Sequence, residues 1–145
     1  MYDNEMHLTF SSRSQNEGFA RVVAGAFASQ LDPTIEELTD IRTAVSEAVT
    51  NAIIHGYENK PGMVFMDCYL QEGKFITEIR DDGKGIEDVA LARQPFYTSK
   101  ASLDRSGMGF TVMEAFMDDV RVESTPGKGT IVHMEKNLRG VGADE

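Results

Sequence analysis

The sequence is poor in cysteine. Cys68 is the only one in 145 residues, which excludes an intramolecular disulfide and a metal cluster built on several thiolates. Its neighbours Met66 and Leu70 are apolar. We therefore expect a thiol that is packed in the core and chemically inert.

Positive charge is also scarce. The chain has 14 lysines and arginines against 24 aspartates and glutamates, for a formal net charge of −10. Nonspecific binding to nucleic acid or to an anionic membrane needs a positive face, so we expect neither partner. A local basic site for a small anion is still compatible with this composition.

Long apolar stretches are missing as well. No run approaches the ~18–20 residues of a membrane-spanning helix. The start of the chain, Met1 to Glu5, lacks the basic and apolar parts of a signal peptide. The expected location is therefore the cytoplasm.

The composition that remains is that of a globular protein, with 41% hydrophobic and 26% charged residues. The length suits one domain with a real core, which we place at residues 1–138. Residues 139–145 are expected to form a frayed C-terminal tail.

Hydrophobic periodicity predicts the order strand, helix, helix, strand, strand, long loop, helix, strand, strand. The expected ranges are strands at 6–10, 63–70, 75–79, 120–122 and 131–134, and helices at 15–30, 33–55 and 107–117, with one helical turn near 89–93. The apolar stripe of the first helix consists of Phe19, Val22, Val23, Ala26 and Phe27. This order predicts an α+β fold: a two-layer α/β sandwich with one mixed, mostly antiparallel sheet and its helices on one face.

The second expected helix has clear end signals and two polar residues on one face. Asp32 is a candidate N-cap, Pro33 suits the first helical position, and Gly56 is a candidate C-terminal stop. Glu47 and Asn51 lie four residues apart, hence one above the other on the helix surface. The apolar residues on the opposite side are Leu38, Ile41, Val45, Ala48 and Ala52. Taken alone, such a pair is typical of a solvated face, and a functional interpretation depends on the motifs that follow.

Two glycine motifs follow. Asp81-Asp82-Gly83-Lys84-Gly85 comes directly after a strand and is either a turn with solvated acids or an acceptor carboxylate for an exocyclic amine such as that of adenine. Its glycines would let a flat ligand approach the backbone. Gly107-Met108-Gly109 precedes a helix, whose N-terminus suits phosphate. About twenty irregular residues between the two motifs are typical of a lid or binding loop.

Other chemistries lack their motifs. The sequence has no P-loop and no G-x-S-x-G elbow. His7, His55 and His133 are scattered without ligand spacing, so metal ligation by cysteine and histidine is not supported.

In order, these motifs resemble the N box and the two glycine boxes of the GHKL (Bergerat-fold) ATPase family. Longer stretches are similar to the anti-sigma F factors of spore-forming bacteria within that family. These stretches are Asn4 to Leu8, Leu31 to Thr34, Ser46 to Tyr57, Ala92 to Pro95 and Arg105 to Phe110. The similarity covers all but roughly the last ten residues.

The resemblance implies ATP and Mg²⁺ as cofactors and a role for each matching residue. Asn51 would bind Mg²⁺, Asp81 would accept a hydrogen bond from the adenine amine, and Glu47 would be the catalytic base. Arg105 would neutralise the γ-phosphate, and Thr130 would lie near the adenine. The remaining nucleotide contacts would come from Gly83 and Gly85 and from Ser106, Gly107, Met108, Gly109 and Phe110.

The resemblance also implies partners: a sigma factor held inactive, an anti-anti-sigma factor phosphorylated on serine, and a second copy in a homodimer. Arg21, beside Phe19 and Val22, is a candidate for a partner or dimer surface and equally for a solvated cation. Two alternatives stay open. One is a nucleotide-dependent inhibitor without catalysis, and the other is a stress-response anti-sigma kinase of the same subfamily. Glu47 alone does not separate a kinase from a hydrolase.

Overall fold

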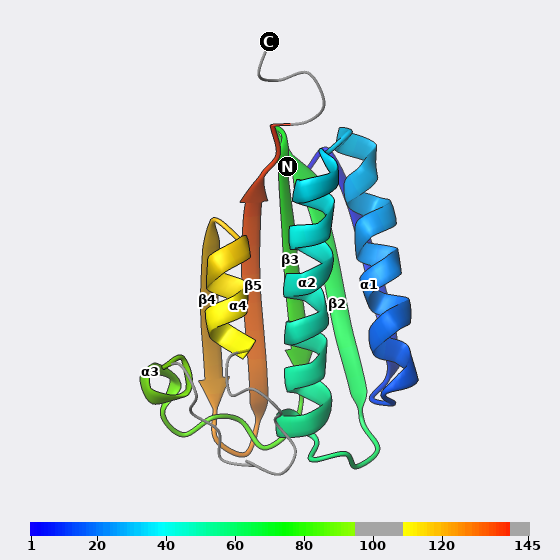
Figure 1. The fold of residues 1–145 in the computed structure, drawn as a ribbon. Helices are drawn as coiled ribbons and strands as arrows, with labels where there is room; N and C mark the ends of the chain where they lie inside the picture. Colours follow the sequence, from blue (N-terminus) through cyan, green and yellow to red (C-terminus); the bar gives the residue numbers. More distant parts are fainter. Residues whose placement is uncertain (95–108, 140–145) are drawn as a thin grey trace.

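The computed structural model describes residues 1–94 and 109–139. Its centre is a five-stranded sheet in the order β1-β2-β3-β5-β4 (Figure 1). The strands are β1 (Asn4–Ser11), β2 (Met63–Gln71), β3 (Lys74–Asp81), β4 (Asp119–Thr125) and β5 (Gly129–Asn137). All four pairings are antiparallel, so the described sheet has none of the parallel pairing that a mixed sheet allows.

The helices cover one face of this sheet. They are α1 (Gln15–Ala28), α2 (Ile35–Asn51) and α4 (Gly109–Phe116), with a short α3 (Val89–Ala92) at the edge beside β4. A 3₁₀ turn, η1 (Ser29–Leu31), follows α1, and a π-helical turn, η2 (Ala52–Gly56), follows α2. The expected two-layer α/β sandwich is confirmed. None of the helices described is long and apolar enough to cross a membrane.

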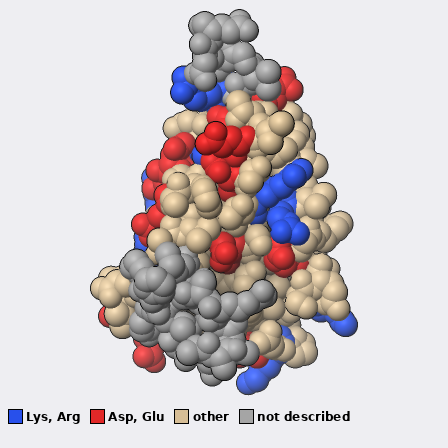
Figure 2. Space-filling model, in the orientation of Figure 1, with Lys and Arg blue, Asp and Glu red and all other residues tan. Residues whose placement is uncertain are grey.

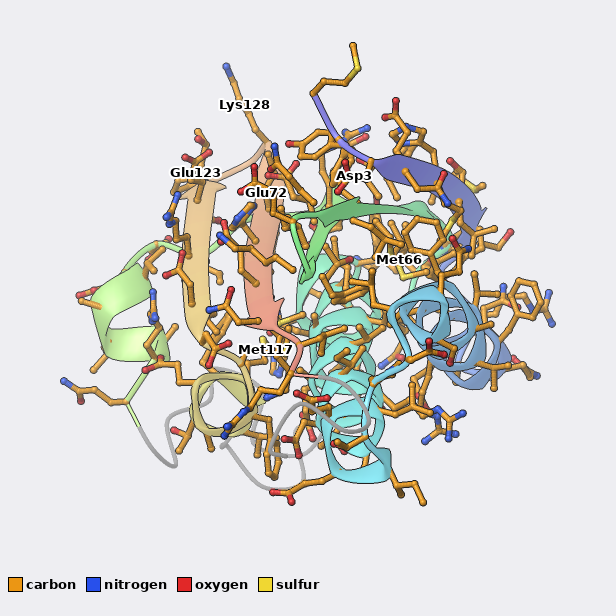
Figure 3. The ribbon with its side chains drawn as sticks, turned by 90° about the horizontal axis from the view of Figure 1, so that it is seen from above. Asp3, Met66, Glu72, Met117, Glu123 and Lys128 are labelled. Carbon is orange, nitrogen blue, oxygen red and sulfur yellow. The ribbon has the colours of Figure 1, made fainter. Side chains whose placement is uncertain are left out.

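The core lies between the two layers. Figure 3 shows Met66 and Met117 between the sheet and the helices, whereas Glu123 lies on the side of the sheet away from them. Cys68 is fully buried in the core, and burial raises the pKa of its thiol to about 12. The prediction of a packed, inert thiol is therefore confirmed.

Figure 2 shows the helix-covered face, where basic side chains stand in small groups among acidic and neutral ones.

The apolar stripe expected on the first helix divides into two parts. Phe27 is buried and Val23 packs against the core, whereas Phe19 and Val22 are 54% and 58% exposed. Ala20 and its neighbours Ala24 and Ala28 are fully buried instead. Small residues on this side bring α1 close to the layer beneath it, which turns the first part of the predicted stripe outward.

The start of α2 differs from the expectation. Thr34, not Asp32, is the N-cap: its hydroxyl accepts a hydrogen bond from the Glu37 N–H at 3.1 Å, and the Glu37 carboxylate accepts one from the Thr34 N–H at 2.9 Å. Asp32 has a left-handed backbone, with φ of 49°, and ends the preceding 3₁₀ turn. A full capping box satisfies two backbone donors, whereas Asp32 offers no such reciprocal pair.

Thr34→Ala is expected to lower the free energy of unfolding by about 0.5–2 kcal/mol because the cap is lost. The measurement is denaturant unfolding of both proteins. Thr39→Ala is the matched control, since the Thr39 hydroxyl only donates to the Ile35 carbonyl within the helix and alanine favours a helix interior. Equal destabilisation by the two changes would contradict the assigned cap.

Candidate nucleotide site

The last turn of α2 presents Glu47 and Asn51. Both side chains are half-buried, while Ala48 and Val49 between them are buried against the core. The predicted separation of an apolar back from a polar face is therefore confirmed for this helix. After Asn51 the helix continues as the π-helical turn η2. Such turns are rare and often lie at functional sites.

The first turn of α4 lies beside Glu47. A Cβ built on Gly109 would lie 3.5 Å from Oε2 of Glu47. Phe110, the next residue, is buried in the core and anchors this end of the helix. The structure thus brings the N-box carboxylate to the N-terminus of α4, where backbone N–H groups and the helix dipole favour anions. The predicted contacts of Arg105, Ser106, Gly107 and Met108 fall outside the described residues.

Asp81 ends β3 and is 3% exposed. Its Oδ1 accepts a hydrogen bond from the Gly83 N–H at 2.9 Å. Burial raises the pKa of this carboxyl from its ordinary 3.8 to about 6, and the neighbouring charge of Asp82 adds to the increase. The N–H groups of Gly83 and Thr130 oppose it. A buried acid with few partners is well placed to accept a further hydrogen bond.

The end of α2 packs directly on Asp81. A Cβ on Gly56 would lie 2.6 Å from the carboxyl carbon of Asp81, and one on Gly83 would lie 2.0 Å from the Gly56 carbonyl oxygen. The Lys84 N–H donates to the same carbonyl at 2.9 Å. Gly56 is therefore required by the carboxylate that occupies its side-chain space. The helical segment ends at Gly56 as predicted. The φ of Gly56 is not positive, so the close approach of Asp81, and not a left-handed backbone, is the reason for glycine at this position.

Further glycines join β3 to the start of β5. Gly85 has φ of +77°, and a Cβ there would lie 2.3 Å from the Thr125 carbonyl oxygen. Gly129 has φ of +123°, and a Cβ there would lie 2.1 Å from the Asp81 carbonyl oxygen. The close approach at these glycines is made by the protein's own backbone. Their predicted role toward a flat ligand stays a prediction.

Thr130 pairs with Asp81 across the β3–β5 ladder and is 4% exposed. Its hydroxyl lies 2.8 Å from that of Ser124, which also accepts the Ile86 N–H at 2.7 Å. The structure therefore brings Thr130 to Asp81, and its place near an adenine stays a prediction. Ser124 was missed because nothing in the sequence shows that its strand lies beside Thr130.

Tyr57 ties the turn after α2 to the end of β3. Its hydroxyl donates to the Met63 carbonyl at 2.5 Å and accepts the Asp82 N–H at 2.7 Å. Sequence spacing does not reveal this role, because one partner begins β2 and the other follows the end of β3. Tyr57 holds in place the segment that begins at Asp81.

These residues fit a nucleotide with a hard cation. Asp81 offers a buried acceptor at one end of the site, and Asn51 offers a carboxamide oxygen, a ligand that suits Mg²⁺. Gly109 opens a helix N-terminus suited to phosphate, with the Glu47 carboxylate beside it. Figure 1 shows the end of α2, the end of β3 and the start of α4 in the lower part of the molecule.

Comparisons with known proteins identify the family of the chain. A model of the histidine kinase-like ATPase domain family matches residues 10–136. The chain is 59% identical over 137 residues to the anti-sigma F factor of Thermoanaerobacter sp. (strain X514), covering 94% of this chain and 96% of that protein. It is 60% identical over 136 residues to the anti-sigma F factor of Halalkalibacterium halodurans, covering 93% of each.

A solved structure of the RsbU and RsbW domains of Rv1364c from Mycobacterium tuberculosis has the same fold, with a TM-score of 0.67 at 20% identity. The match covers 93% of this chain and 32% of that one. The chain therefore belongs to the histidine kinase-like ATPase domain family, and within it to the anti-sigma F factors. The family resemblance found in the sequence is confirmed.

Proposed function

We propose that the chain is an ATP-dependent protein-serine kinase and anti-sigma factor. It binds a sporulation sigma factor, sigma F, and keeps it from RNA polymerase. With Mg-ATP it phosphorylates a serine of an anti-anti-sigma factor. The proposal draws its partners from the names of relatives such as the Thermoanaerobacter anti-sigma F factor.

One observation carries the enzymatic part of the proposal: α2 serves both ends of the site. Its Glu47 lies against Gly109 at the N-terminus of α4, and Gly56 of the following turn packs on the buried Asp81. An adenine held at Asp81 would therefore extend its phosphates along α2 toward α4. That path passes Asn51, one helical turn beyond Glu47.

The chemistry assigned to the chain follows from these positions. When bound, Mg-ATP supplies the transferable phosphoryl group and the metal charge that stabilises it. Asn51 holds the metal through its carboxamide oxygen, and Asp81 accepts a hydrogen bond from the adenine amine. Glu47 takes the proton from the serine hydroxyl as the oxygen attacks phosphorus and the bond to ADP breaks. Most of the rate then comes from positioning and charge stabilisation.

A glutamate in this position could activate water as well as a serine hydroxyl. Transfer of the phosphoryl group to a protein is therefore the property that distinguishes a kinase from a hydrolase. Incubation with labelled ATP and the anti-anti-sigma protein separates the kinase from a hydrolase and from an inhibitor without catalysis. Capture of purified sigma factors on the immobilised chain tests the other half of the proposal. We expect sigma F to be retained in the presence of nucleotide. If a stress-response sigma factor were retained and sigma F were not, the proposed partner would be the stress-response sigma factor.

The pH dependence of nucleotide binding tests Asp81. Because its pKa in the folded protein is about 6, the carboxyl is ionised at pH 7.5 and mostly protonated at pH 5. Only the ionised form accepts strongly from an amine. ATP affinity should therefore be constant above about pH 7 and decrease below pH 6 by up to about tenfold per unit.

The measurement is the ratio of affinities for ATP and for the triphosphate of purine riboside, which lacks the amine. Protonation of the triphosphate affects the binding of both nucleotides in the same way, so its effect cancels in this ratio. A ratio that stays constant from pH 7.5 to pH 5 would contradict the role of Asp81 as amine acceptor.

Two parts of the proposal concern assembly. The chain is proposed to act as a homodimer in the cytoplasm, with no direct contact to nucleic acid or membrane. The exposed Phe19 and Val22 of α1 agree with an interface there. Sedimentation of the chain alone measures the dimer.

A further inference from the structure

The face of the sheet opposite the helices carries a cluster of metal-ligating side chains. Side chains alternate along β3, so that Thr77 and Ile79 are buried beneath the helices while Glu78 between them and Lys74 point to the other face. Figure 3 shows that side chains stand on this second face without a helix over them. Nothing in the nucleotide site uses this surface.

Two neighbouring strands, β4 and β5, contribute the cluster. Asp119 of β4 is directly opposite Glu135 of β5 in the ladder, and His133 lies two residues before Glu135 on the same face. The cluster has three ligand atoms, one from each side chain, and these atoms lie within 4.8 Å of one another. The residues are Asp119, His133 and Glu135. All three side chains are half-buried. Among the residues that the structure describes, this is the one group of three such ligands.

We propose that Asp119, His133 and Glu135 bind one first-row divalent transition-metal ion, for which Zn²⁺ is the probe. One imidazole nitrogen and two carboxylate oxygens are ligands that Zn²⁺ accepts, with the fourth position left to water. Ligand atoms around one Zn²⁺ lie about 3–3.5 Å apart. The ligand atoms need to move by only about 1 Å to reach that spacing. Side-chain rotation is enough for this movement, because the paired strands already hold the backbone in place.

Glu78 gives the cluster a second feature of metal sites. Its carboxylate lies 2.8 Å from Nδ1 of His133, and the Nε2 atom of the same ring lies 2.7 Å from Glu135. Metal-ligating histidines usually donate their other ring N–H to a carboxylate, which fixes the tautomer and the ring orientation. Glu78 accepts that proton from Nδ1, and Nε2 then faces the other two ligands.

Two cations compete with the metal, but each occupies only part of its carboxylate. The Lys74 ammonium contacts Oε1 of Glu135 at 3.1 Å, whereas Oε2 is the atom beside His133. The Arg121 guanidinium contacts Oδ2 of Asp119 at 2.8 Å. Each salt bridge uses one of two oxygens, so a metal can take the other without displacing the cation.

Such an ion would be structural. It would join the edge strand β4 to β5, and through Glu78 to β3, on the face opposite the described helices. Because a metal that binds only the folded state stabilises it by mass action, Zn²⁺ should raise the unfolding temperature. Cys68 is buried with a pKa of about 12, so it does not compete for the ion.

The test uses the full chain, stripped of metal with a chelator and free of nucleotide and Mg²⁺. Calorimetric titration with Zn²⁺ alone should show one saturable equivalent and a matching rise in the unfolding temperature. His133→Gln should lose both. Glu78→Gln keeps every ligand and should weaken the affinity roughly 10–100-fold.

His7→Gln is the matched control. His7 also lies between two carboxylates on this face of the sheet, those of Asp67 at 2.6 Å and Glu5 at 3.0 Å, but it belongs to no cluster of three ligands that could hold a metal. This variant should bind Zn²⁺ as the parent does. Circular dichroism and ATP binding verify that each variant is folded. Absence of saturable binding by the parent, unchanged binding by His133→Gln, or equal loss in His7→Gln would each overturn the site.

Discussion

Glu47→Gln is expected to lower phosphotransfer to the anti-anti-sigma protein by ~10²–10⁴-fold, the usual contribution of a general base. Glutamine has the shape of glutamate and fits the same half-buried position beside Gly109. It cannot take the proton from a serine hydroxyl. ATP binding should be spared, because adenine recognition is assigned to Asp81 at the other end of the site. The measurements are single-turnover phosphotransfer and ATP affinity on the same preparations.

Glu36→Gln provides the matched control. Glu36 is exposed in the first turn of the same helix, far along α2 from the site, and its replacement should leave the rate unchanged. If Glu47→Gln lost ATP binding and phosphotransfer to the same extent, Glu47 would be a binding or structural residue and the role of base would be withdrawn.

Asp81→Asn should reduce ATP affinity by roughly 10–100-fold. A hydrogen bond to a charged group is worth about 1.5–3 kcal/mol. In addition, the NH₂ group of asparagine can face the adenine amine, and two hydrogen-bond donors cannot pair. Guanine has a carbonyl oxygen at that position. The preference for ATP over GTP should therefore narrow as ATP binding weakens.

The same change should not destabilise the fold. Burial raises the folded-state pKa of Asp81 to about 6 from 3.8, so the folded protein holds this proton more tightly than the unfolded chain does. Ionisation consequently opposes folding, and the associated stability is lost as pH rises from about 4 to 6. Asparagine removes that cost at neutral pH, and its oxygen can still accept the Gly83 N–H.

Asp82→Asn is the control for Asp81→Asn, since Asp82 is the exposed neighbour. It should leave the affinity for ATP nearly unchanged. If Asp81→Asn bound ATP as tightly as the parent protein, Asp81 would not contact the adenine. If the variant were unfolded at neutral pH, Asp81 would be a structural residue.

Most of the fold could be predicted because it depends on local patterns. Alternation identified each strand that the structure describes, and helical periodicity identified α1, α2 and α4. The turn at Glu72-Gly73 connects β2 and β3 with positive φ at both residues, as a type I′ hairpin turn requires. Helix ends were less predictable. Thr34, the real cap, lies two positions after Asp32, and only the reciprocal bonds to Glu37 decide between them.

The candidate site could be predicted where its residues share a helix or a turn. Glu47 and Asn51 are one helical turn apart, and Asp81 lies within two residues of Gly83. Gly56 could not be understood in this way, because its side-chain space is filled by Asp81, 25 residues further along the chain. The His133 cluster was missed for the same reason. Asp119 and Glu78 reach it through the pairing register of three strands, which sequence spacing does not reveal.

The most direct test of the proposed kinase is transfer of label from γ-labelled ATP to purified anti-anti-sigma protein in the presence of Mg²⁺. The wild-type chain should place the label on a serine of that protein, and Glu47→Gln should place almost none there while still binding ATP. Release of free phosphate with no label on protein would show a hydrolase. Bound ATP with neither product would show an inhibitor without catalysis, and either result would contradict the proposed function.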